Sequence, residues 1–129
     1  MGCAIPLAIG AHFIKLDRTV VSFCGDAGLL MVAGELTTAK KLNLNTIFVI
    51  FVDASLALTE LKQRQRQPTN NGVDFAQHDL AAMGKTFGGN GHTVHTRDEL
   101  RVALKAAQEA QEFTVIAAVI EKGAYDGRI

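Results

Sequence analysis

The chain has 129 residues, of which 48% are apolar and 20% are charged, and its mean hydropathy is +0.16. This size fits one domain, and so apolar a composition excludes an intrinsically disordered chain. Thirteen basic residues balance thirteen acidic ones, which excludes binding to nucleic acid or to an anionic membrane through bulk charge. The apolar run at residues 47–52 is far too short to span a bilayer.

The apolar pattern predicts helices that alternate with strands. In chain order we predict a helix over residues 3–16, a strand over 19–24, a helix over 29–42, a strand over 46–52, a helix over 56–64, a loop over 65–73, a helix over 75–87, a strand centred on 93–95, a helix over 97–111 and a strand over 114–120. Strands that are apolar throughout, such as 46–52, are typical of parallel sheets. We therefore predict an α/β fold, with a mostly parallel sheet of about four strands and helices on both faces.

The predicted ligand site lies where two strands end, because open parallel sheets bind ligands beyond the carboxyl ends of their strands. Residues 25–28 (Gly-Asp-Ala-Gly) follow one strand, and their glycines allow a phosphate to approach the backbone amides of the next helix. Asp53 follows the neighbouring strand, and the amides from Ser55 onward are predicted to open another helix. Asp26 and Asp53 can each give Mg²⁺ an oxygen ligand. Two alternatives stay open, a turn role for Asp26 and an N-cap role for Asp53.

These segments resemble the signature of thiamine-diphosphate (ThDP) enzymes, in which Gly-Asp-Gly is followed by a helix, a strand and Asn-Asn or Asn-Asp. Residues 35–39 (Glu-Leu-Thr-Thr-Ala), 43–44 (Asn-Leu) and 52–56 (Val-Asp-Ala-Ser-Leu) also resemble segments of the acetolactate-synthase-like subgroup. Further similarity at residues 74–75, 87–88 and 124–127 extends the resemblance over essentially the whole chain. The chain thus resembles the C-terminal diphosphate-binding domain of these enzymes.

The resemblance implies a ligand role for nine residues. Mg²⁺ would be held by the side chains of Asp26 and Asp53 and by the carbonyl of Ser55. The backbone cradle of the diphosphate would consist of Gly25, Ala27 and Gly28, the amides of Leu56 and Ala57 would approach the phosphates, and Met1 would lie against the cofactor rings. Two positions depart from the family pattern: Ala27 replaces a glycine, which disfavours a positive φ there, and Val52 replaces the first asparagine.

The resemblance also implies what the chain needs from elsewhere. The family's domain begins some tens of residues before the position of Met1, so we expect residues 1–129 to form a single, N-terminally truncated domain. The catalytic glutamate of the family lies on a separate pyrimidine-binding domain, and Glu35 does not correspond to it. We therefore expect a pyrimidine-binding domain or subunit to be required for activity on 2-keto acids. The neutral charge and high hydropathy, together with the family's architecture, predict a homo-oligomer.

Other readings of the sequence stay open. The chain is alternatively a non-catalytic α/β fragment or module without a cofactor, or the small subunit of a two-subunit ThDP-dependent keto-acid decarboxylase. The glycines of residues 88–91 favour a helix end and turn over a dinucleotide site, because they precede a strand. His92 and His95 are predicted to point to opposite faces of a strand and so not to share a metal. Two cysteines without a Cys-x-x-Cys motif, one of them Cys24 beside the site, predict buried thiols in a reducing cytoplasm.

Overall fold

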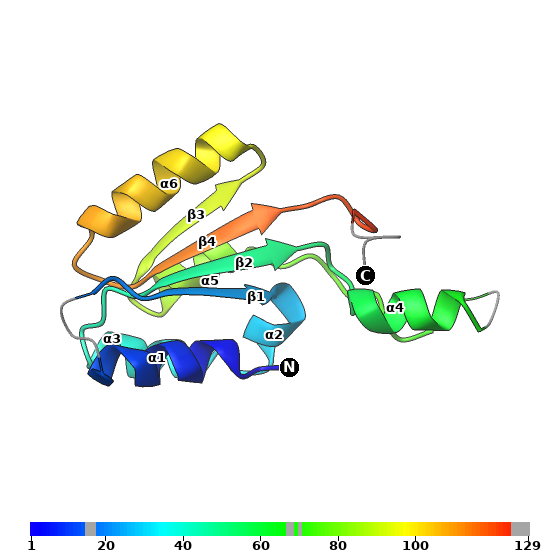
Figure 1. Ribbon diagram of the computed structural model, residues 1–129, viewed down its shortest axis with the longest axis horizontal. Coiled ribbons are helices and arrows are strands. Elements are labelled where there is room, and N and C mark those ends of the chain that lie inside the picture. The colour runs from blue at the N-terminus through cyan, green and yellow to red at the C-terminus, as the bar shows by residue number, and fades with distance from the viewer. Residues whose placement is uncertain (15–17, 67–68, 70, 125–129) are drawn as a thin grey trace.

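A computed structural model describes residues 1–14, 18–66, 69 and 71–124 (Figure 1). Its elements in chain order are α1 (Ala4–Ile14), β1 (Val21–Gly25), α2 (Asp26–Leu30), α3 (Glu35–Lys41), β2 (Ile47–Val52), α4 (Ala57–Arg64), α5 (Leu80–Thr86), β3 (Asn90–Val94), α6 (Arg97–Glu109) and β4 (Thr114–Val119). Among the described residues, no helix is both long and apolar enough to cross a membrane.

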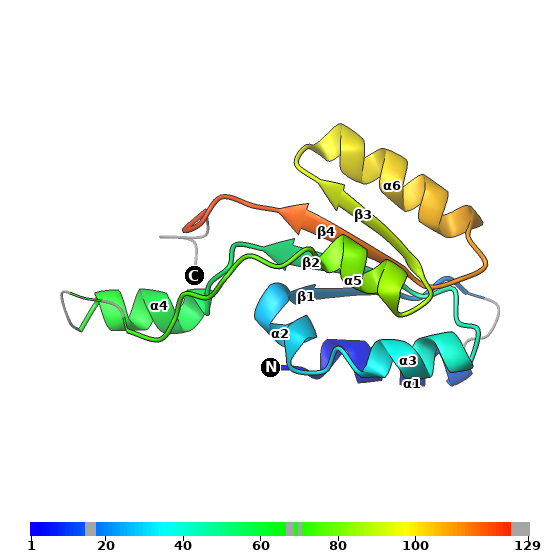
Figure 2. The same ribbon diagram turned by 180° about the vertical axis from the view of Figure 1, so that it is seen from behind.

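The four strands pair in parallel in the order β1-β2-β4-β3. The two central strands, β2 and β4, are almost entirely buried, which explains why their sequences are apolar throughout. Helices cover both faces: α1, α2, α3 and α5 pack on one side, and α6 packs on the other (Figures 1 and 2). The predicted fold class, an α/β domain with a parallel sheet of about four strands, is confirmed.

A close approach between α5 and β3 depends on a glycine. A Cβ atom built at Gly91 would lie 2.0 Å from the carbonyl oxygen of Ala81 in α5. Because that neighbour is backbone, it cannot rotate away, and only glycine fits at this position.

The face of the sheet that carries α6 is only partly covered. Phe23 of β1 and Phe51 of β2 lie on this face, and their side chains stack with ring centroids 6.2 Å apart. They are 60% and 40% exposed, and Val21 beside them is 41% exposed. Among the described residues, α6 packs over β3 and β4 (Figure 1), and this aromatic pair stays partly exposed.

Three predicted elements differ from the structure. The helix predicted over 29–42 is two helices, because the amides of Val32 and Glu35 bond to carbonyls three residues back and the chain turns before α3. The helix predicted over 75–87 begins only at Leu80, where the carboxylate of Asp79 accepts the amide of Ala82 at 2.8 Å and caps it. The strand predicted around 93–95 runs from Asn90 to Val94, so the turn predicted over residues 88–91 ends at Gly89.

The predicted start of α6 is confirmed by its cap. The Thr96 hydroxyl accepts the Glu99 amide at 3.2 Å. In return, the Glu99 carboxylate accepts the backbone amide of His95 at 2.6 Å, one residue before the N-cap. This bond takes His95 out of the ladder of β3.

Candidate functional site

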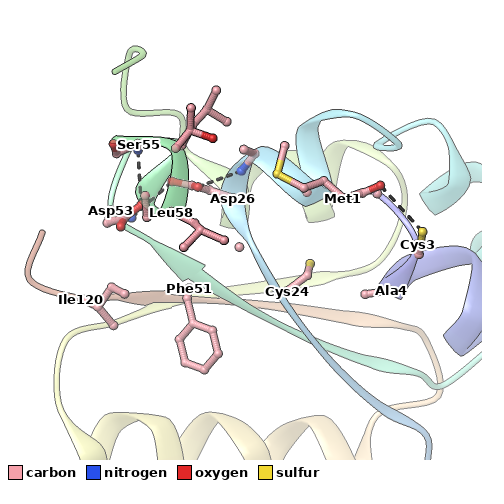
Figure 3. A pocket seen from close by; sticks show the side chains of 17 residues that line it. Met1, Cys3, Ala4, Cys24, Asp26, Phe51, Asp53, Ser55, Leu58 and Ile120 are labelled. Carbon is pink, nitrogen blue, oxygen red and sulfur yellow. Dashed lines mark hydrogen bonds between the residues drawn. The ribbon is translucent and has the colours of Figure 1, made fainter. Parts of the chain in front are cut away.

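The carboxyl ends of β1 and β2 border a cavity of about 490 Å³. All nine residues predicted to contact the cofactor line it: Met1, Gly25, Asp26, Ala27, Gly28, Asp53, Ser55, Leu56 and Ala57. In Figure 3, Asp26, Asp53 and Ser55 gather at one end of the cavity, and Met1 and Cys3 lie at the other. The parallel topology thus brings together segments that are far apart in the sequence.

Asp26 is 4% exposed and holds the ends of both strands together. Its Oδ1 accepts the amide of Ala27 at 2.7 Å, and its Oδ2 accepts the amides of Ala54 at 2.8 Å and Asp53 at 3.2 Å. A carboxylate offers about four lone-pair positions. These three bonds leave Asp26 with capacity for one cation contact, so the structural role and the predicted metal role are compatible.

Asp53 and Ser55 form a tight turn directly after β2. The Asp53 Oδ1 accepts the Ser55 amide at 3.2 Å, a local bond that aspartate often makes in turns. Ala54 between them has a φ of +54°, in the left-handed region. The alternative prediction of an N-cap role for Asp53 is wrong, because Leu56 occupies the N-cap position of α4.

The amides that follow Asp53 are less available than the sequence indicates. We predicted that amides from Ser55 onward open a helix, but the Ser55 amide bonds to Asp53, and the Leu56 amide donates to the carbonyl of Val73 at 2.7 Å. Ala57 is the first residue of α4, where helical amides have no partner within the helix. A phosphate at this end would therefore meet the Ala57 amide without displacing an existing bond of the helix.

At the other strand end, the glycines leave room for a ligand. A Cβ atom built at Gly25 would meet nothing within 4 Å, although Gly25 lines the cavity. A Cβ at Gly28 would make an ordinary contact with Cys24 at 3.7 Å. Ala27, whose replacement of glycine raised the question of a positive φ, lies within α2 and is not among the positive-φ residues.

The charge of the cavity favours a cation. Among the described side chains that line it, those of Asp26 and Asp53 are the charged ones, and none belongs to Lys, Arg or His. Carboxylate and carbonyl oxygens are the ligands that Mg²⁺ prefers, and Mg²⁺ usually keeps several waters. Over the described ranges, no group of three or more His, Cys, Asp or Glu side chains is arranged to hold a metal. A site built here would thus use two carboxylates, the backbone and water.

Cys24 lines the cavity next to these carboxylates. Burial, and after it the nearby charge of Asp26, raises the pKa of its thiol to about 11. The thiol therefore stays protonated at neutral pH and is a poor nucleophile. This agrees with the prediction of an unreactive cysteine at this position, and Cys24 is half-buried. The prediction that both thiols are buried is wrong for Cys3, which is exposed.

Sequence reasoning missed several lining residues, namely Gly2, Cys3, Ala4, Phe51, Leu58, Thr59 and Ile120. Gly2 and Leu58 directly neighbour the predicted site residues Met1 and Ala57, and this adjacency is the sequence signal for them. Ile120 follows β4, which lies beside β2, and only the strand order places it at this cavity.

The family described as "Thiamine pyrophosphate enzyme, C-terminal TPP binding domain" matches residues 1–118. The chain belongs to this family. The catabolic acetolactate synthase of Raoultella terrigena is 32% identical over 121 residues, which are 94% of this chain and 22% of that protein. The acetolactate synthase of Bacillus subtilis (strain 168) is 31% identical over 116 residues, which are 90% of this chain and 20% of that protein.

A solved structure is also similar in fold. The thiamine diphosphate-dependent 4-hydroxybenzoylformate decarboxylase of Rhodococcus jostii RHA1 has a TM-score of 0.87 at 21% identity, over 94% of this chain and 23% of that chain. The predicted resemblance to the diphosphate-binding domain of ThDP enzymes is thus confirmed. The chain spans about a fifth of the curated relatives it matches, 22% and 20% for the two named above.

Proposed function

We propose that the cavity between β1 and β2 binds Mg²⁺ and the diphosphate of ThDP. Asp26, Asp53 and the carbonyl of Ser55 would hold the ion, and the backbone of residues 25–28 with the amide of Ala57 would contact the phosphates. The observation that carries the proposal is that all nine residues implied by the family line one cavity. Membership of the TPP-binding family supports the choice of cofactor.

The electrostatics of the cavity support the metal. A diphosphate and two carboxylates repel each other, and the described lining residues contribute no cationic side chain. A divalent cation between them turns this repulsion into two attractions. The remaining capacity of Asp26 and the open space beside Gly25 are consistent with such an arrangement.

We further propose that this domain serves a cytoplasmic 2-keto-acid decarboxylase or carboligase that resembles acetolactate synthase. The names of the relatives support this reaction class, and their greater length supports a need for a pyrimidine-binding domain or subunit. ThDP supplies the carbon–carbon bond chemistry in such enzymes, and this chain would bind and orient it. A homo-oligomer is part of the proposal, since the stacked Phe23 and Phe51 offer an apolar contact surface.

Calorimetric titration of the purified chain with ThDP tests the central proposal. In excess Mg²⁺ we expect binding heat and a raised melting temperature at about 1 mM ThDP, and both should vanish in EDTA. Asp53→Asn should weaken this binding by about tenfold or more, because it removes a charge from the site. Asp98→Asn, an exposed change on α6, is the matched control and should bind as the wild type does.

No heat and no thermal shift in excess Mg²⁺ would contradict the proposal and favour a module without a cofactor. The DNA upstream of the coding sequence distinguishes a domain of one longer enzyme from the small subunit of a two-subunit enzyme. A continuous frame that encodes a glutamate-bearing pyrimidine domain supports a single longer enzyme, and a separate upstream gene supports a small subunit.

A further inference from the structure

The turn after β2 is held from two sides by aspartates. On the inner side, Asp26 accepts the amides of Asp53 and Ala54. On the outer side, the Asp74 carboxylate accepts the hydroxyl of Ser55 at 2.9 Å. Ser55 is 4% exposed, so this bond satisfies a buried hydroxyl. The turn that carries two of the proposed metal ligands is thus clamped between two carboxylates.

Backbone hydrogen bonds join the same two segments as the bond from Ser55 to Asp74. Residues 53–56 run antiparallel to residues 73–75, with Ser55 opposite Asp74. The Leu56 amide donates to the carbonyl of Val73 at 2.7 Å, and the Phe75 amide donates to the carbonyl of Ala54 at 3.1 Å. These bonds close the base of the segment that carries α4, which extends beyond the carboxyl ends of the strands (Figures 1 and 2).

A third segment joins this base from the end of β4. The ammonium group of Lys122 donates to the same Oδ1 of Asp74 at 2.7 Å. This bond raises the pKa of Lys122, and the bonds from Lys122 and then Ser55 lower the pKa of Asp74. Asp74 therefore stays ionised at neutral pH and connects three segments that are remote in sequence.

We propose that Asp74, itself oriented by Lys122, is a positioning residue that holds the β2–α4 turn ready for the metal–diphosphate ligand. Asp74 does not line the cavity and acts through Ser55. This inference rests on the proposed function, because the ligand whose binding it serves is the one proposed above. It assigns a role in cofactor binding to residues outside the predicted metal site.

The contacts around Asp74 predict how strongly each substitution should weaken the Mg²⁺-dependent binding of ThDP. Asp74→Ala removes the shorter hydrogen bond of the buried Ser55 hydroxyl and leaves it only the carbonyl of Val73 at 3.5 Å, so its effect is the largest. Lys122→Ala removes only a contact whose two side chains are 49% and 53% exposed, and exposed ion pairs contribute little. Lys122→Arg keeps a cation beside Asp74, so it should weaken ligand binding much less than Lys122→Ala does. Arg101→Ala breaks a comparable exposed pair with Asp98 on α6 and is the matched control.

The test is the Mg²⁺ concentration that half-saturates ThDP binding, measured by calorimetry well below the melting temperature of every variant. We expect this concentration to rise about tenfold in Asp74→Ala and about threefold in Lys122→Ala. It should return to within about twofold of wild type in Lys122→Arg, and Arg101→Ala should not change it. A wild-type value in Asp74→Ala would overturn the inference.

Hydrogen exchange of the unliganded chain provides a second readout that needs no cofactor. Asp74→Ala should speed amide exchange at Ser55 and Leu56 and leave exchange in β4 unchanged. Unchanged exchange at Ser55 and Leu56 would overturn the positioning role even if ThDP binds. If the wild type fails to bind ThDP, the proposed function is wrong, and this exchange experiment alone decides whether Asp74 holds the turn.

Discussion

Replacing Asp26 by alanine should cost stability as well as ligand binding. The carboxylate accepts three backbone amides, from Ala27, Asp53 and Ala54, at 2.7, 3.2 and 2.8 Å. Alanine removes both acceptor oxygens, and with them all three bonds, and leaves the turn after β2 without its inner support. We therefore expect Asp26→Ala to destabilise the unliganded chain, which a residue that served only as a metal ligand would not do.

The size of the effect follows from the number of bonds. A net contribution of about 1 kcal/mol for each hydrogen bond gives a loss of about 3 kcal/mol in the free energy of unfolding. This value lies below the range of about 1.5–3 kcal/mol for a bond to a charged acceptor, because cavity water can solvate the freed amides. Asp79→Ala is the matched control: this aspartate caps α5 through a single bond to the Ala82 amide, and its loss should cost about 1 kcal/mol.

Urea denaturation without Mg²⁺ or ThDP measures both variants on one scale. Asp26→Ala should show the larger loss and should also abolish the Mg²⁺-dependent binding of ThDP. Asp79→Ala should keep that binding. A loss in Asp26→Ala no greater than that in Asp79→Ala would refute the view that Asp26 joins the two strand ends.

Four further outcomes are expected. Iodoacetamide at pH 8 should alkylate the exposed Cys3 and spare Cys24 in the native chain, and equal rates by mass spectrometry would contradict the raised thiol pKa. Since the unfolded thiol ionises first, the free energy of unfolding should fall as pH rises from 9.0 to about 11, and Cys24→Ala should reduce this fall. Ala54→Val should destabilise the chain by about 1–2 kcal/mol, because a β-branched residue tolerates the left-handed region poorly, and unchanged urea denaturation would contradict this. Gly91→Ala should cost at least about 1–3 kcal/mol through the clash with Ala81, and a wild-type melting temperature would contradict the close packing of α5 on β3.

The sheet and the meeting of Asp26 with Asp53 were predictable from the sequence. The two strands are marked by β-branched and apolar runs, and an aspartate stands at each carboxyl end. Parallel strands with crossover helices then place both carboxylates at one edge. Local pattern was sufficient here because each signal lies within a few residues of the feature it predicts.

The features that the sequence did not predict depend mostly on contacts between segments that are remote in the sequence. The apolar run from Leu29 to Ala33 continues through the turn between α2 and α3, and Gly34 is the one helix-breaking residue between this run and α3. The late start of α5 follows from the pairing of residues 73–75 with the turn after β2. The link from Asp74 to Lys122 joins segments on either side of β3, α6 and β4, and no spacing in the sequence indicates it.

The most direct test of the account replaces Mg²⁺ by Mn²⁺ in an amide NMR spectrum of the chain with ThDP bound. The paramagnetic ion broadens the amides near it. We predict that broadening is strongest at residues 25–28 and 53–57, and that it disappears in Asp53→Asn. Broadening centred elsewhere in the chain, or no broadening with ThDP in excess, would contradict a metal–diphosphate site at the ends of β1 and β2.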